Sequence, residues 1–173
     1  MITIRTAGID DAHAIAEVQV NSWRTTYAGI VSEENLRSMK VEDREKKWEW
    51  VIQQDAKERI MLVAEDQLGR IVGFASAGPT FHSEYEYEGE LYALYLLEEY
   101  QRQGIGRRLV SAVMDHFQKV GIRSMLTLAL EENTACLFYE RMGGRIITRV
   151  EVKIGEQILP ELVFGWENLN LKG

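Results

Sequence analysis

A glycine-bearing turn between an apolar run and an amphipathic run constrains the fold of this chain more than any other feature. The apolar run at 91–97 predicts a buried strand, and the apolar side chains at 105–120 recur at helical spacing. Between the two runs lies Gln101-Arg102-Gln103-Gly104-Ile105-Gly106. A strand that enters a helix in this way leaves the first N–H groups of the helix unpaired, at the positive end of the helix dipole. Because glycine lacks a Cβ atom, a phosphate group can approach that backbone closely, so the turn predicts an anion site.

Two familiar nucleotide-binding loops do not fit this turn. The chain has no Gly-x-x-x-x-Gly-Lys-Ser/Thr sequence, and Gly-x-Gly-x-x-Gly would need a glycine where Leu109 stands. A turn that opens a helix and binds no ligand is the alternative for this segment taken alone. The nearby Arg102, Arg107 and Arg108 favour the anion site because they add positive charge.

The bulk properties favour one globular domain, residues 1–173. The chain is 46% apolar and 27% charged, which is ordinary for a soluble protein, and no repeat is present. The single cysteine excludes an internal disulfide, and the chain turns polar at once, unlike a signal peptide. No apolar run approaches the ~20 residues of a membrane span. We therefore expect a cytoplasmic protein that does not bind a membrane. Its net charge of −7 also disfavours nucleic acid as a partner.

The periodicity of apolar residues predicts strands and helices in the order β-α-α-β-β-β-α-β-α-β-β, with Asp10 or Asp11 as the cap of the first helix. This order indicates an α/β (α+β) fold with about seven strands and helices on both faces of the sheet. The expected strands are 2–5, 59–64, 71–77, 91–97, 125–130, 145–154 and 157–166. The expected helices begin near Asp11, Ser32, Ile105 and Asn133.

Two segments together resemble the GNAT superfamily of acetyl-CoA-dependent N-acetyltransferases. The turn resembles the Gln/Arg-x-x-Gly-x-Gly/Ala signature of that family, and 133–144 resembles its Asn…Tyr-Glu-Lys/Arg-x-Gly segment. The segments stand in the family's order and separation. One departure is that Asn133 precedes Tyr139 by six residues, where many members have seven. The resemblance implies a mixed, mostly antiparallel seven-stranded sheet with a splayed central strand pair, and acetyl-CoA as the acyl donor without a metal.

The resemblance also implies which residues bind the cofactor. An unpaired backbone N–H in the central strand, within residues 95–97 and first of all at Leu96, would donate a hydrogen bond to the thioester or the pantetheine. The backbone amides of the turn would bind the pyrophosphate. The residues implied are Tyr95, Leu96, Leu97, Gln101, Arg102, Gln103, Gly104, Ile105, Gly106, Arg107, Arg108 and Asn133.

Tyr139 and Glu90 are the candidate catalytic residues. By resemblance, Tyr139 would protonate the departing thiolate of coenzyme A, a role that suits a hydroxyl with a reference pKa of about 10. The alternative is a buried aromatic residue that only packs the last helix. Glu90 would be the general base, directly or through a water chain, and period two places it on the face of Tyr92, Leu94 and Leu96. The alternative for Glu90 is a solvated carboxylate at the end of a strand.

The histidines and the cysteine are weaker candidates. His82 is a rival base only because its reference pKa lies near 6.5, and His116 falls on an apolar helix stripe. His13 is expected on the surface. Cys136 is expected in the core, because the sequence offers no nearby histidine to activate it.

The acceptor site is predicted from aromatic and acidic residues. Trp23, Tyr27 and Tyr92 are candidates to line it, although aromatic residues at such spacing are also typical of a core. Glu84, Glu86, Glu88 and Glu90 recur at every second residue, so an extended segment would form an acidic edge that attracts a cationic amine. The alternative is an ordinary solvated acidic loop.

The sequence thus predicts an enzyme that moves an acetyl group from acetyl-CoA to a primary amine of a small molecule, such as a polyamine or another basic amine, in a ternary complex. An acetyltransferase that acts on a protein N-terminus or lysine is an alternative. A non-catalytic module that senses acyl-CoA is another, but it would leave Tyr139 and Glu90 without a role. The oligomeric state stays open, a homodimer included.

Overall fold

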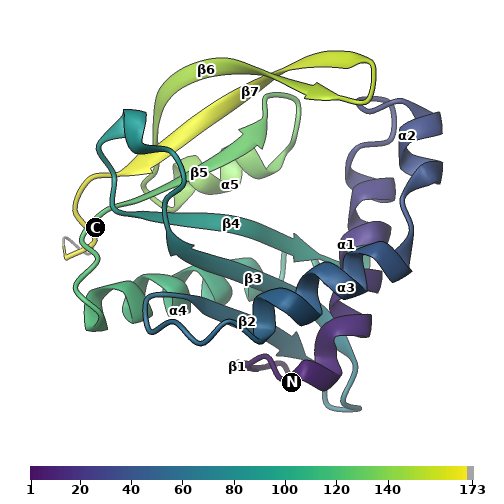
Figure 1. Cartoon of the computed structure of the whole chain (residues 1–173), viewed down its shortest axis with the longest axis horizontal. Helices are drawn as coiled ribbons and strands as arrows, with labels where there is room; N and C mark the ends of the chain where they lie inside the picture. Colours follow the sequence, from purple (N-terminus) through teal and green to yellow (C-terminus); the bar gives the residue numbers. More distant parts are fainter. Residues whose placement is uncertain (171–173) are drawn as a thin grey trace.

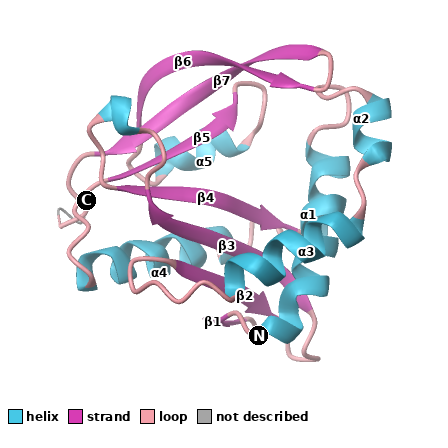
Figure 2. Ribbon diagram, in the orientation of Figure 1, coloured by secondary structure: helices cyan, strands magenta, loops and turns pink. Residues whose placement is uncertain are grey.

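Seven strands form one sheet across the molecule (Figures 1 and 2). The computed structural model describes residues 1–170. The strand order is β1-β2-β3-β4-β5-β7-β6, and every neighbouring pair is antiparallel except β4 and β5. The strands are β1 Thr3–Thr6, β2 Ile60–Glu65, β3 Ile71–Pro79, β4 Gly89–Leu96, β5 Met125–Leu130, β6 Arg145–Ile154 and β7 Gln157–Trp166. The predicted mixed, mostly antiparallel sheet is confirmed.

Helices cover both faces of the sheet. They are α1 Ala12–Thr26, α2 Glu33–Ser38, α3 Val41–Ile52, α4 Ile105–Lys119 and α5 Ala135–Arg141. On one face Trp48 of α3 packs edge-on against Phe74 of β3, with ring centroids 5.2 Å apart. On the other face a Cβ on Gly89 of β4 would lie 2.7 Å from the ring of Phe117 of α4. The helices therefore sandwich the sheet, as the sequence predicts.

Local sequence explains where the helices begin. Ser32 caps α2, since its hydroxyl accepts the N–H of Asn35 at 3.2 Å. Asp11 precedes α1, but its carboxylate accepts the N–H of Gly8 at 2.7 Å and pairs with Arg5 at 2.8 Å. Asp11 therefore closes the 3-10 turn Ile9–Asp11, and the expectation that it or Asp10 caps α1 by its side chain is wrong.

The central strand pair is splayed. β4 and β5 pair only through Gly89 with Met125 and Glu90 with Leu126. The hydroxyl of Thr127 on β5 still reaches the carbonyl of Leu91 on β4, at 2.8 Å. Beyond this bond the strands diverge, and Figure 1 shows β4 running toward α1 while β5 rises toward the β6–β7 hairpin. The predicted splay is confirmed, and it opens a gap in the middle of the sheet.

A bulge in β4 changes which side chains share a face. Ser76 of β3 pairs with Ala93 and Ala77 pairs with Leu91, so Tyr92 is an extra residue on β4. Glu90, which pairs with Gly78, therefore lies on the face of Ala93 and Tyr95, opposite Leu94 and Leu96. The expectation that period two places Glu90 beside Leu94 and Leu96 is wrong, because one inserted residue reverses the alternation.

The acidic segment before β4 is not extended. Residues Ser83–Tyr85 form a 3-10 turn, and Glu86 has a left-handed backbone with φ 55°. The carboxylate of Glu88 accepts the N–H of Arg123 at 3.2 Å, while that of Glu90 is buried in the strand. The predicted acidic edge from Glu84 to Glu90 is therefore wrong, since the turn sends these side chains in different directions.

Candidate active site

The glycine turn has the geometry of an open anion site. Gly104 has φ +83°, and a Cβ at this position would meet nothing within 4 Å, so the backbone faces open space. Helix α4 begins at the next residue. Its first N–H groups lack intrahelical partners and point out of the helix end. Arg102, just before Gly104, also has a positive φ of 63°, which is uncommon outside glycine.

The charges around this turn fit a pyrophosphate. Arg102, Arg107 and Arg108 are exposed, and their guanidinium groups make no ion pair or hydrogen bond with another side chain among residues 1–170. The two glutamines turn inward instead: Gln101 donates to the carbonyl of Leu96 at 3.2 Å and Gln103 to that of Glu99 at 3.1 Å. The arginines are thus available to an anion, whereas Gln101 ties the turn to β4 and Gln103 ties it to the preceding 3-10 turn Glu98–Tyr100.

The backbone N–H of Leu96 in β4 points toward the gap. Leu97 donates its N–H to the carbonyl of Val72 on β3 at 2.9 Å. Since successive N–H groups of a strand point in opposite directions, the N–H of Leu96 points away from β3 and that of Tyr95 points toward it. The carbonyl of Leu96, on the same side as its N–H, accepts the Ser22 hydroxyl at 3.0 Å. The expectation that Leu97 or Tyr95 could supply the unpaired N–H is wrong.

Glu90 is a buried, oriented carboxylate. It is 7% exposed, and one of its oxygens accepts the Thr80 hydroxyl at 3.0 Å and the N–H of Phe81 at 3.2 Å. Its other oxygen lies 3.7 Å from Nε2 of His82. Glu90 is therefore not the solvated strand end considered as the alternative. The structure places His82, its rival as a base, directly beside it.

Tyr139 is a buried residue whose hydroxyl lies near the point where β4 and β5 diverge. It is 5% exposed, and its ring packs against Phe164 at 5.6 Å and Trp166 at 6.1 Å. The Thr127 hydroxyl, which bridges β4 and β5, lies within hydrogen-bonding reach of it. Burial, together with the nearby Tyr95, raises the pKa of Tyr139 well above its ordinary value. Tyr139 is thus a neutral O–H donor across the physiological pH range.

Glu161 on β7 lies near Glu90 and His82, and it is not among the site residues predicted from the sequence. It is half-buried opposite Leu130 of β5, and its charge interacts with those of His82 and Glu90. Burial raises its pKa, His82 opposes the rise, and Glu90 adds to it. Burial, with a contribution from the charge of Glu161, also raises the pKa of Tyr95. An alternating strand in a closing hairpin carries no local signal of this proximity, because only the pairing of distant strands brings Glu161 near Glu90.

The predicted acceptor residues do not all meet. Tyr92 donates its hydroxyl to the carbonyl of Pro79, and burial raises the pKa of Tyr92 to about 12. Its ring stacks on Phe81 at 5.1 Å, beside the residues that hold Glu90. Glu84 is exposed and lies 3.3 Å from Nδ1 of His82. Tyr92 and Glu84 therefore border the Glu90 side of the site, whereas Trp23 and Tyr27 come from α1.

Trp23 and Tyr27 form a separate aromatic pair. Their ring centroids are 4.5 Å apart, and Tyr27 is 6% exposed. The Tyr27 hydroxyl accepts a hydrogen bond from Nδ2 of Asn133 at 3.0 Å. The indole N–H of Trp23 is buried and completes no hydrogen bond among residues 1–170, although the Tyr95 hydroxyl lies close by.

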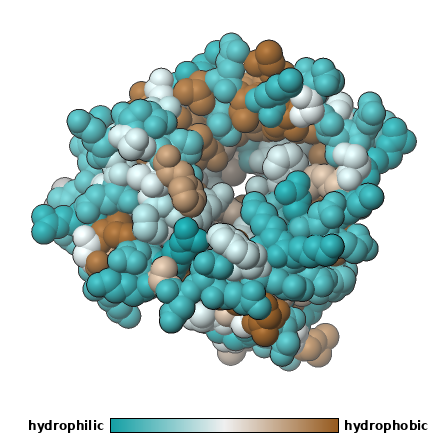
Figure 3. Space-filling view, viewed as in Figure 1, coloured by the Kyte–Doolittle hydropathy of each residue, from teal (hydrophilic) through white to brown (hydrophobic). Residues whose placement is uncertain are grey.

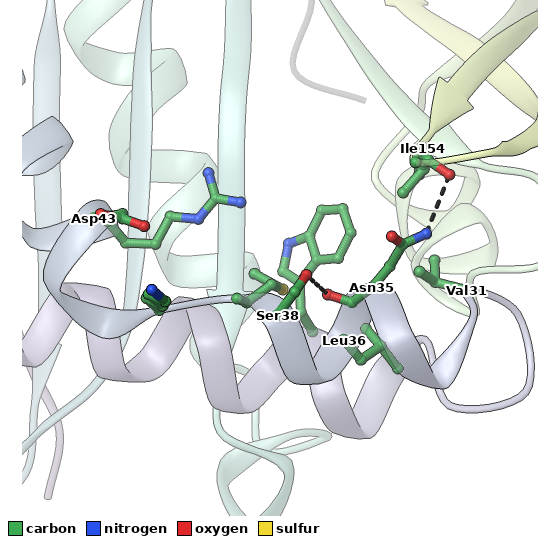
Figure 4. A pocket seen from close by; sticks show the side chains of 11 residues that line it. Val31, Asn35, Leu36, Ser38, Asp43 and Ile154 are labelled. Carbon is green, nitrogen blue, oxygen red and sulfur yellow. Dashed lines mark hydrogen bonds between the residues drawn. The ribbon is translucent and has the colours of Figure 1, made fainter.

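A pocket of about 370 Å³ lies between α1, α2, α3 and the β6–β7 turn (Figure 4). Trp23 is its only wall residue among the four predicted acceptor residues. Asn35 closes one side by donating to the carbonyl of Ile154 at 3.3 Å. Asp43 and Arg44 give the pocket charges of both signs. In the space-filling view, drawn in the orientation of Figure 1, the molecule is hollowed near its centre (Figure 3).

The remaining candidates are structural. Cys136 is buried, its thiol donates to the carbonyl of Leu130 at 3.3 Å, and burial raises its pKa to about 11. His13 is exposed and lies 2.5 Å from Glu45. His116 is partly buried on α4, and its Nε2 has no partner among the described residues. Cys136 and His13 thus lie where the sequence predicts.

Residues 21–144 match the Acetyltransferase (GNAT) family. The chain belongs to the GNAT family. The match contains both motifs noted in the sequence and ends at Gly144, the last residue of the second. The protein is therefore an acetyl-CoA-dependent N-acetyltransferase, an acyltransferase rather than a non-catalytic module.

Relatives agree with this GNAT membership over almost the whole chain. The chain is 36% identical over 170 residues to an uncharacterized N-acetyltransferase, YuaI, of Bacillus subtilis (strain 168), covering 98% of this chain and 95% of the relative. It is 28% identical over 148 residues to a spermidine N(1)-acetyltransferase of Thermoplasma acidophilum, covering 84% and 89%. A crystal structure of the PaiA N-acetyltransferase of Thermoplasma acidophilum in complex with coenzyme A is 26% identical, with a TM-score of 0.72 and coverage of 93% and 98%.

Two further properties concern the described residues only. No helix within 1–170 is both long and apolar enough to cross a membrane. Over the same residues, no three histidine, cysteine or acidic side chains come together in a way that could hold a metal ion.

Proposed function

We propose that this GNAT enzyme acetylates a primary amine of a small molecule at the gap between β4 and β5, by direct attack of the amine in a ternary complex. The observation that supports the proposal is the splay of β4 from β5, with Glu90 buried at their last pair and the buried Tyr139 hydroxyl beside Thr127 of β5. In the reaction a C–N bond forms, the C–S bond of the thioester breaks, and two proton transfers are needed.

The glycine turn and β4 are proposed to hold acetyl-CoA. The N–H groups at the start of α4, with Arg102, Arg107 and Arg108, bind the pyrophosphate. The N–H of Leu96, turned into the gap, is a donor for the thioester or the pantetheine. The side chains of Gln101 and Gln103 support this by fixing the turn to the backbone rather than by touching the cofactor.

Tyr139 and Glu90 are proposed to carry the two protons. Glu90 accepts the proton of the attacking amine, directly or through water, with its free oxygen on the side of His82. Tyr139 donates its proton to the departing thiolate, which its raised pKa allows because the hydroxyl stays protonated. Asn133 is proposed to contact the pantetheine with the amide hydrogen that Tyr27 leaves free.

A basic amine, with a polyamine as the first candidate, is the proposed acceptor. Glu90 on β4 and Glu161 on β7 lie close enough for their charges to interact, and together they favour a cation near them. In this proposal Glu90 and Glu161, and not the acidic edge predicted from the sequence, attract the cationic amine. A relative named as a spermidine acetyltransferase points in the same direction. The pocket beside Trp23, with Asp43 and Arg44 in its wall, can hold the rest of the molecule.

The test is release of free thiol from acetyl-CoA with a panel of amines. The panel contains spermidine and spermine, matched monoamines, amino acids, and a peptide with a free N-terminus and a lysine. We expect the polyamines to give the highest kcat/KM. Turnover with the peptide alone would overturn the small-molecule acceptor, and no thiol release with any amine would overturn the proposed chemistry at this gap.

A further inference from the structure

Tyr27 makes a buried hydrogen bond between parts of the chain that are remote in sequence. It is the C-cap residue that follows α1, is 6% exposed, and packs against Trp23 with ring centroids 4.5 Å apart. Its hydroxyl accepts Nδ2–H of Asn133 at 3.0 Å, across 106 residues of sequence. The hydroxyl oxygen thus accepts a hydrogen bond from the protein, and Tyr27 is not in the wall of the pocket beside Trp23.

Asn133 is held at both ends of its amide. Its Oδ1 accepts the N–H of Ala135, the first residue of α5, at 2.9 Å, and its Nδ2 donates to Tyr27. These two bonds fix which way the amide faces, since the oxygen has a donor and the nitrogen an acceptor. One hydrogen of Nδ2 remains free for a further acceptor. Without the Tyr27 hydroxyl, the Asn133 side chain would keep only its bond to the N–H of Ala135, and its amide could rotate out of this orientation.

Helix α5, which carries Tyr139, needs such an anchor. It has seven residues, and an isolated helix of that length is not stable in water. Its position must therefore come from tertiary contacts. In the second turn of α5, these tertiary contacts come from the packing of Tyr139 against Phe164 and Trp166. At the start of α5, they come from the two hydrogen bonds of Asn133.

We infer that Tyr27 is a positioning residue that orients Asn133 toward acetyl-CoA and locks the start of α5 to α1. The inference rests on the proposed contact of Asn133 with the cofactor. It replaces the expectation that Tyr27 contacts the acceptor amine. Because α1 also supplies Trp23 to the acceptor-side pocket, the Tyr27–Asn133 bond joins the wall of that pocket to the helix of Tyr139.

The test is a double-mutant cycle on acetyl-CoA affinity, measured by calorimetry without an acceptor. Tyr27→Phe removes one hydroxyl and keeps the ring against Trp23. We expect it to raise the Kd about three- to tenfold, as for one lost hydrogen bond that orients a ligand contact. Asn133→Ala should raise the Kd at least as much, and adding Tyr27→Phe to it should change nothing further, because the partner is already gone.

Two further variants keep the result interpretable. Asn133→Ser retains an oxygen for the N–H of Ala135 and serves in the cycle if Asn133→Ala does not fold. Gln19→Leu breaks another buried bond of α1, the one from Nε1 of Trp48 to Oε1 of Gln19 at 2.7 Å, and should lower the thermal midpoint without changing the Kd. This control separates a general loss of stability from a loss of orientation.

Two outcomes would overturn the inference. In the first, Tyr27→Phe binds acetyl-CoA as tightly as the wild type. In the second, the effects of Tyr27→Phe and Asn133→Ala on the Kd multiply. Neither outcome depends on finding the acceptor, so absence of turnover with every amine would count against the proposed function alone.

Discussion

At the scale of single residues, burial determines which protonation state each candidate group holds. Tyr139 has a raised pKa because its hydroxyl is buried, so it can donate a proton but cannot act as a base near neutral pH. We expect Tyr139→Phe to lower kcat roughly 10²-fold, as for a lost general acid, with little change in the Kd for acetyl-CoA. Steady-state kinetics at several pH values, with calorimetry, would check this. A variant that keeps the wild-type kcat at every pH would remove Tyr139 from the reaction.

The raised pKa of Glu161 predicts how the stability of the protein depends on pH. Burial, aided by Glu90 and opposed by His82, raises its pKa above the ordinary value of 4.5. As the pH rises past that value, the unfolded chain releases this proton before the folded protein does, so the free energy of unfolding falls until the pH exceeds the raised pKa. Glu161→Gln should remove this decrease. Thermal midpoints of the two proteins should therefore diverge as the pH rises from about 4 to about 7, with the variant higher; parallel curves would contradict the shift.

At the scale of elements, what could be predicted follows from the range of the interactions. Helix α4 and the hairpin of β6 and β7 lie where apolar periodicity and turn residues place them, because those signals are local. The bulge at Tyr92 arises from pairing with β3, and it moved Glu90 to the face of Tyr95. Glu161 lies near Glu90 only because β7 pairs with β5, between β5 and β6. Pairings of this kind join distant segments and leave no periodic trace in the sequence.

The conformation of the glycine turn predicts how substitutions in it affect acetyl-CoA binding. Gly104 has φ +83°, a left-handed conformation that a β-branched residue tolerates poorly, even though a Cβ there would meet no atom within 4 Å. Gly104→Val should therefore change the path of the turn and raise the KM for acetyl-CoA about tenfold or more, while the protein stays folded. Arg108→Gln should cost less, because an exposed charge is screened and partly redundant with the amides. Unchanged affinity in a folded Gly104→Val protein would exclude the turn from the cofactor site.

At the scale of the whole molecule, a net charge of −7 attracts a cationic acceptor from a distance, whereas Glu90 and Glu161 act only near the gap. Salt distinguishes the two contributions, because the Debye length falls from ~30 Å at 0.01 M to ~8 Å at 0.15 M ionic strength. Long-range attraction should weaken over this range, while a contact inside the partly buried gap should persist. The KM for a polyamine should therefore rise with salt in the wild type, yet stay below that for a matched monoamine.

Two single variants with the same change in net charge separate these contributions. Glu161→Gln removes a carboxylate at the gap, whereas Glu86→Gln removes an exposed one from the turn before β4. Both should shift the salt dependence by a similar small amount, since each changes the net charge by one unit. Only Glu161→Gln should raise the KM for the polyamine at 0.15 M salt, by about three- to tenfold, because it removes a charge that meets the bound amine. Equal KM values for the two variants at that salt concentration would show that the acceptor senses the charge of the whole protein and not the carboxylates of the gap.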